Sequence, residues 1–156
     1  MIKRHVLIAL FTAILFTVTA TISIPIAYGF VNLSDTLIYL FASVLPLKYS
    51  FFIAAIGTSI ADIFLGFGQY ALFTFFIKGI EAVIVSKIEN KNSLIQFGSA
   101  GLFMMLAYAI TDVVLLGSPV AFLPSLSYNG IQALVSVLFA RAFVKRFTEY
   151  YHKMNK

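Results

Sequence analysis

The sequence contains no cysteine and no tryptophan, and charged residues make up only 11% of its 156 positions. Without cysteine, neither a disulfide framework nor a cysteine-based metal site can form. Soluble domains carry about 25% charged residues, so the low charge and the 61% hydrophobic content indicate a protein of the lipid bilayer. We expect residues 1–156 to form a single integral-membrane domain.

Catalytic and nucleotide-binding patterns are also missing. His5 and His152 are the two histidines, and they stand near the two ends of the sequence. No histidine–carboxylate metal set and no Ser-His-Asp arrangement can therefore form within the apolar segments. The Gly-x-x-x-x-Gly-Lys-Ser/Thr pattern for ATP is absent as well. We expect no enzyme, no cofactor and no metal, so any energy for uptake must come from a partner or an ion gradient.

The basic residues are unevenly distributed. Eleven lysines and arginines outnumber six acids, and apart from Lys78 they lie at the N-terminus, near Pro46, at 87–91 and at the C-terminus. The connections 25–34, 66–70 and 117–124 contain none. This positive-inside pattern predicts two cytoplasmic termini and an even number of crossings in the cell membrane. The excess charge then faces anionic lipid rather than nucleic acid.

The apolar runs predict an all-α fold, a polytopic bundle of six transmembrane helices. The expected segments are residues 6–24, 35–46, 49–66, 70–87, 94–116 and 125–147. The first run resembles a secretory signal, but at ~1.5 Å per residue it is long enough to span, and its removal would leave an odd number of crossings.

The sequence also predicts which residues cap two of the helices and how long the second helix is. Ser34 offers an N-cap with Asp35 in the following first turn, and Ser125 or Ser127 can cap the sixth helix. The second helix covers about 11–13 residues, too few for a ~30 Å hydrocarbon core. It should be shallow or tilted, with the neutral loop 25–34 dipping toward the interior.

Polar side chains interrupt the apolar helices at positions that gather in the outer half of the bundle. An ionisable group at mid-depth costs at least about 2.5 kcal/mol, so such groups indicate a functional site by default. We therefore expect one polar chamber that opens outward. Its candidate members are Asp62, Lys78, Glu81, Tyr108, Asp112, Asn129 and Gln132.

Two interpretations of these groups remain open. Lys78 would be neutralised by Glu81 or by Asp62, and such a buried pair can serve only to fix helix register. A structural role is favoured for Asp62 and Glu81. Ligand contact is favoured for Lys78 and for Tyr108, Asn129 and Gln132, although the two amides can instead bond across helices. Asp112 fits either role equally.

Two stretches carry a family resemblance. IGTSIADIFLGF at 56–67 and FIKGIEA at 76–82 resemble the substrate-binding subunits (S components) of energy-coupling factor (ECF) vitamin transporters. Ala9-x-x-x-Ala13 and Pro124-x4-Asn129-x2-Gln132 match further parts of the pattern. The sequence departs from the family at Phe67, where tyrosine is usual, at Ala82, where glycine is usual, and at Ser34-Asp35, where Gly-Asp is common.

The resemblance implies a binding subunit that captures a water-soluble vitamin and works with a transmembrane coupling (T) subunit and two cytoplasmic ATPases. Riboflavin, a pyridoxine-like ring and hydroxymethylpyrimidine are candidate ligands, bound among the fourth to sixth helices. It implies that Ala9 and Ala13 meet the coupling subunit, and that Asp35 belongs to an outer-loop lid. Lys78, Tyr108, Asn129 and Gln132 would bind the ligand's polar edge, with Asp112 on a ring nitrogen or hydroxyl.

Two other functions remain in view. A structural scaffold similar to rod-shape-determining membrane protein D has a comparable size and helix count, and it needs no charged pocket. A solitary proton-coupled solute carrier would use Glu81 or Asp62 as its proton site.

Overall fold

The computed structural model describes residues 4–26, 29–88 and 92–154. Lys3, Lys91 and Lys156 of the predicted charge pattern lie outside these ranges. The described elements are α1 (Arg4–Thr21), β1 (Ser23–Ile26), β2 (Gly29–Asn32), α2 (Ser34–Ala42), α3 (Leu47–Phe64), α4 (Ala71–Lys87), α5 (Ser93–Leu116), the 3-10 helix η1 (Pro119–Ala121) and α6 (Phe122–Met154).

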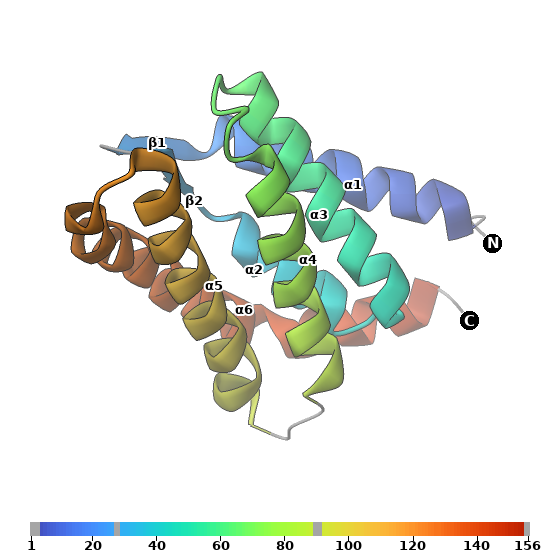
Figure 1. Cartoon of the computed structure of the whole chain (residues 1–156). Helices are drawn as coiled ribbons and strands as arrows, with labels where there is room; N and C mark the ends of the chain where they lie inside the picture. The colour runs from blue at the N-terminus through green and yellow to red at the C-terminus, as the bar shows by residue number, and fades with distance from the viewer. Residues whose placement is uncertain (1–3, 27–28, 89–91, 155–156) are drawn as a thin grey trace.

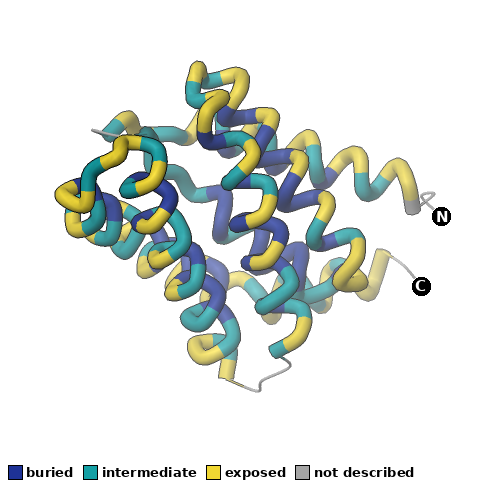
Figure 2. Tube along the Cα trace, viewed as in Figure 1, coloured by how far each residue is buried: buried dark blue, intermediate teal, exposed yellow. Residues whose placement is uncertain are grey.

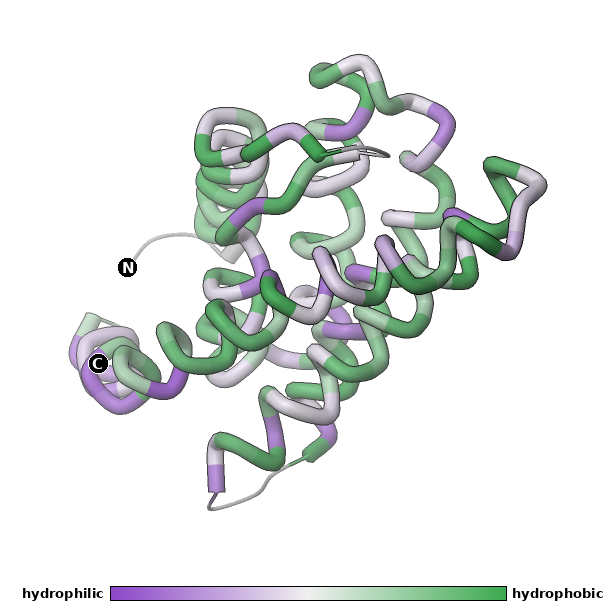
Figure 3. The backbone as a smooth tube through the Cα atoms, turned by 90° about the vertical axis from the view of Figure 1, so that its left-hand side faces the viewer, coloured by the Kyte–Doolittle hydropathy of each residue, from purple (hydrophilic) through white to green (hydrophobic). Residues whose placement is uncertain are grey.

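The all-α membrane fold is confirmed. Three helical stretches, Leu47–Phe64, Ser93–Leu116 and Pro119–Met154, are long and apolar enough to cross a bilayer, and His5–Thr21 is a shorter apolar helix. Large apolar side chains such as Phe64, Leu72 and Val114 are more than half exposed, as expected where lipid replaces water as the solvent. Figure 3 shows hydrophobic residues along most of the helices and a hydrophilic C-terminal part of α6. Both termini lie on one side of the molecule (Figure 1).

The antiparallel pair α3 and α4 forms one wall of the bundle. Gly66 allows the turn between them, because its φ of 86° is in the left-handed region, and the Phe67 N–H donates to the Asp62 carbonyl at 2.8 Å. Lower down, a Cβ at Gly79 would overlap the Phe51 ring. The glycine therefore lets the two helices approach closely.

Residues 23–26 and 29–32 form the two paired strands of a β-hairpin, where the sequence suggested a neutral loop over residues 25–34. β1 and β2 pair antiparallel with Pro25 opposite Phe30 and Ser23 opposite Asn32. Their pairing satisfies the backbone N–H and C=O groups of both strands. Strands of four residues are too short to show a clear alternation of polar and apolar positions, so these two strands could not be predicted from the pattern. β1 contacts α1 and β2 contacts α6, so the hairpin covers one end of the bundle.

The second helix lies in the centre of the bundle, enclosed by other helices. Seven of its nine residues are buried, and it contacts α1, α3, α4 and α6. Figure 2 shows this central segment mostly in the colour of buried residues. A helix enclosed by its neighbours need not span the hydrocarbon core, which explains its length.

Two of the predicted helix caps are wrong. α2 begins at Ser34 itself, and its first N–H donates to the Asn32 Oδ1 at 2.8 Å. Asn32 therefore provides the side-chain acceptor that was expected from Ser34. α6 begins at Phe122, which leaves Ser125 and Ser127 inside the helix. Pro124 fits the first turn because its missing N–H has no helical acceptor there. α6 also continues past residue 147 to Met154.

Candidate functional site

A polar cavity lies between the hairpin and the helices. The space between its lining atoms is about 550 Å³ with open solvent included, and the lining comes from the hairpin, from all six described α-helices and from the α3–α4 turn. The structure brings together in this lining all but two of the predicted polar residues. The members found there are Asp62, Lys78, Tyr108, Asp112, Asn129 and Gln132, and Asp35 and Glu81 lie just behind the wall.

One face of α4 gives the cavity its long axis. Tyr70 precedes the helix, and Thr74 and Lys78 follow at intervals of four residues, so the three side chains project from the same side. At 1.5 Å per residue they cover roughly 12 Å of depth. Tyr70 therefore marks the end near the α3–α4 turn, and Lys78 marks the deep end.

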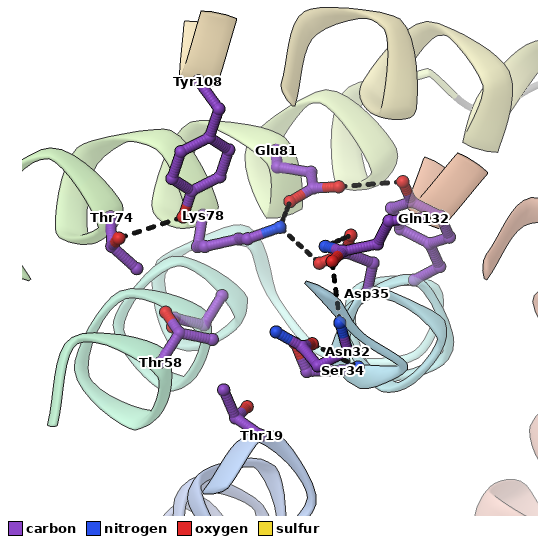
Figure 4. A network of polar contacts seen from close by, with 12 residues as sticks. Thr19, Asn32, Ser34, Asp35, Thr58, Thr74, Lys78, Glu81, Tyr108 and Gln132 are labelled. Atoms are coloured by element: carbon purple, nitrogen blue, oxygen red, sulfur yellow. Dashed lines mark hydrogen bonds and ion pairs between the residues drawn. The ribbon is translucent and has the colours of Figure 1, made fainter. Parts of the chain in front are cut away.

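Lys78 holds a buried ionic network at the deep end (Figure 4). Its Nζ pairs with Asp35 and, at 3.0 Å, with Glu81 Oε2. The second oxygen of Glu81 accepts a hydrogen bond from the Tyr39 hydroxyl at 2.8 Å. The ammonium also lies 5.4 Å from the centroid of the Tyr108 ring, within cation–π range. Of the two pairings expected for Lys78, the one with Glu81 is present and the one with Asp62 is wrong.

Asp35 is part of this network and not of a lid. It is fully buried at the start of α2, and its Oδ2 accepts from the Gln132 amide at 2.7 Å. Gln132 Oε1 in turn accepts from the Asn32 N–H at 2.8 Å. The Gln132 side chain thus joins α6 to both the hairpin and α2, and it holds the deep wall of the cavity in place.

Carboxylates and aromatic rings surround the other end. The Tyr70 hydroxyl donates to Asp112 Oδ1 at 2.6 Å, which joins the α3–α4 turn to α5. Phe67 lies between Phe30 and Tyr70, with ring centroids 5.4 Å and 6.5 Å away. The cavity is therefore polarised, with the Lys78 ammonium and the Gln132 amide at depth and two acids, Asp62 and Asp112, toward the turn.

Over residues 1–149 the chain matches the family model described as "ECF-type riboflavin transporter, S component". The chain belongs to this family. It is a membrane-embedded substrate-binding subunit of a vitamin transporter and not an enzyme. The family resemblance of the two motif stretches is thereby confirmed, and the scaffold interpretation loses its support.

A curated relative adds a second comparison. The S component is 35% identical over 106 residues to an "Uncharacterized protein in gap 3'region" from Pyrococcus woesei, which covers 65% of this chain and 71% of the relative.

Several lining residues of the S component escaped the sequence analysis. Tyr70 and Thr74 could have been predicted from their spacing, since they stand eight and four positions before Lys78 on one helix face. Asn32 and Phe30 could not, because their place depends on the undetected hairpin. Thr58 looked like an ordinary small residue of a membrane helix.

The alanine pair of the first helix lies apart from the cavity. Ala9 and Ala13 are exposed on α1, whereas Phe11 and Leu15 of the same helix are buried in the core. The S component therefore presents these two small side chains on an outward helix face. Their contact with a partner stays a prediction.

Proposed function

We propose that this S component captures riboflavin in the cavity between the hairpin and α3–α6. The family description names riboflavin transporters, and the cavity combines aromatic and polar lining residues from several helices, as small-molecule sites do.

The observation that carries the proposal is the polarity of the cavity. A lysine ammonium has three N–H donors, and Lys78 directs two of them to Asp35 and Glu81. The third is available to a carbonyl oxygen of the flavin's pyrimidine ring. Phe67, Tyr70 and Tyr108 supply aromatic surface for the planar ring system. Asp112 then lies at the end where a hydroxyl or ring nitrogen is to be bound.

Flavin fluorescence provides the test. Riboflavin titrated into the purified protein should lose its fluorescence on saturable binding, because stacking on aromatic side chains quenches the ring. Pyridoxine and hydroxymethylpyrimidine should not displace it at equal concentration. Displacement of riboflavin by either smaller ring would refute the assignment of the ligand.

A variant of Asn129 tests the location of the site. Asn129 lines the cavity, whereas Ser127 on the same helix is exposed. Loss of one hydrogen bond to a ligand costs about 1 kcal/mol, so Asn129→Ala should weaken riboflavin binding roughly fivefold. Ser127→Ala is the matched control and should leave the affinity unchanged. Equal affinities for both variants would place the ligand elsewhere.

The transport cycle requires partners in this proposal. The chain has no nucleotide-binding pattern, so a transmembrane coupling subunit and two cytoplasmic ATPases would supply the energy, with both termini of the S component on the cytoplasmic side. Vesicles that contain all the subunits should take up riboflavin when ATP is enclosed. Uptake by the S component alone, abolished by an uncoupler, would instead support a solitary proton-coupled carrier.

A further inference from the structure

Asp62 is the buried acid of the cavity that the ionic network does not use. Its side chain lines the cavity near the α3–α4 turn, and the residue is only 4% exposed. Among the described residues its Oδ2 has no hydrogen-bond partner, whereas the other buried side-chain atoms in that state are hydroxyl oxygens. Burial of a carboxylate oxygen without a donor is costly, so this atom calls for an explanation.

The donors around Asp62 are already engaged. Thr74 lies beside the Asp62 carboxylate, and its Oγ1 accepts a hydrogen bond from the Tyr108 hydroxyl at 3.0 Å. The Tyr70 hydroxyl is directed to Asp112, and Lys78 is paired with Asp35 and Glu81. None of these groups donates a hydrogen bond to Oδ2, and Asp62 is one of the residues that line the cavity.

We propose that Asp62 Oδ2 is a ligand-binding atom that accepts a hydrogen bond from a hydroxyl group of the bound molecule. With Asp112 it would form a hydroxyl subsite on the side of Lys78 that faces the α3–α4 turn, suited to a polyol chain. The inference rests on the proposed function, since the ribityl chain of riboflavin is such a polyol. It replaces the structural role that the sequence favoured for Asp62.

The polarity of the cavity sets the direction of the ligand. An acceptor-rich ring edge fits the ammonium of Lys78 at depth, and hydroxyl donors fit carboxylates. The Asp62–Thr74 contact lies one helical turn above Lys78 on α4, so a flavin with its carbonyl edge on Lys78 would extend its side chain toward the α3–α4 turn. Asp62 would thus discriminate between flavins with and without hydroxyl groups on that side chain.

The experiment compares riboflavin with lumiflavin, which carries a methyl group in place of the ribityl chain. Both affinities are measured by fluorescence quenching for the wild-type protein, Asp62→Asn and the exposed-acid control Glu149→Gln. A hydrogen bond to a charged group contributes enough that its loss should weaken riboflavin binding about tenfold or more in Asp62→Asn. Lumiflavin affinity should change less than about twofold, and the control should match the wild-type protein.

Each outcome decides the proposal. An equal loss for both flavins, or no loss for riboflavin, would overturn it. Retained lumiflavin binding by Asp62→Asn also shows that the variant is folded, and Asp62→Ser provides a second variant that lacks Oδ2. Failure of both variants to fold would assign Asp62 to the fold alone and overturn the proposal. A wild-type protein that binds neither flavin would refute the proposed function itself, and the Asp62 assignment with it.

Discussion

At the scale of single residues, the central feature is Lys78, which pairs with the two buried carboxylates of Asp35 and Glu81. Each described side-chain hydrogen bond of Asp35 and Glu81 is accepted by the carboxylate, and the donors are Lys78, Gln132 and Tyr39. Removing one partner from such a buried network leaves charge uncompensated, which is far more costly than the loss of an exposed ion pair.

Lys78→Met should therefore be strongly destabilising. It leaves Asp35 and Glu81 buried without a cation, at a cost of about 3–5 kcal/mol, and we expect a clear drop in melting temperature in detergent. The exposed Lys87 of the same helix gives the control Lys87→Met, which should melt close to the wild-type protein. The double variant Lys78→Met with Glu81→Gln should be more stable than Lys78→Met alone. Equal melting of the two lysine variants would contradict the network.

Tyr39→Phe tests the neutral member of the same network. The Tyr39 hydroxyl is the donor to Glu81 Oε1, and both side chains have no exposed surface. A buried acceptor that loses its donor costs about 1–3 kcal/mol, so the variant should unfold at a lower temperature. Tyr150→Phe, at a residue that is 68% exposed, should show no shift. A Tyr39 variant as stable as this control would mean that the hydrogen bond contributes nothing.

Part of this network could be predicted from the sequence. The spacing of Lys78 and Glu81 places them on one helix face, and their pairing follows from it. Asp35 stands 43 positions before Lys78, and its role depends on α2 lying in the centre of the bundle. Helix periodicity cannot give that depth, so Asp35 was assigned to a lid and Asp62 was considered as the partner of Lys78.

At the scale of elements, close packing of α3 against α4 positions the cavity wall. Gly79→Ala should disturb it, because the added methyl group would overlap the Phe51 ring; overpacking of this kind typically costs about 1–3 kcal/mol. Gly98→Ala on α5 is the matched control, since nothing lies within 4 Å of its Cβ position. That control should be neutral or slightly stabilised, because alanine favours helix. Thermal melting distinguishes them, and a Gly79 variant as stable as the control would contradict the packing.

The elements differed in how well the sequence predicted them. α3, α4 and α5 lie within a few residues of their expected bounds, because long apolar runs end at Pro46, at the Gly66 turn and at Gly117. The hairpin and the start of α6 were missed. Both depend on local backbone pairing in short apolar segments. In such a segment the hydrophobic pattern does not distinguish a strand from a loop or a helix.

At the scale of the whole molecule, the chain separates a binding cavity from an outward face of α1. If Ala9 and Ala13 meet the coupling subunit, a bulky side chain there should block assembly without affecting the vitamin site. Ala13→Trp should abolish co-purification with the coupling subunit and keep riboflavin affinity. Ile110→Trp, at a residue of α5 that is 58% exposed, should assemble normally. Full assembly of the Ala13 variant would exclude this face as the interface.

The most direct measurement of the central claim is native mass spectrometry of the purified chain with riboflavin. The polar cavity predicts one bound flavin per wild-type chain. Asn129→Trp should bind none, because its indole would fill the cavity. Ser127→Trp, on the exposed side of α6, should keep the flavin. A flavin retained by Asn129→Trp, or absent from the wild-type protein, would contradict the account.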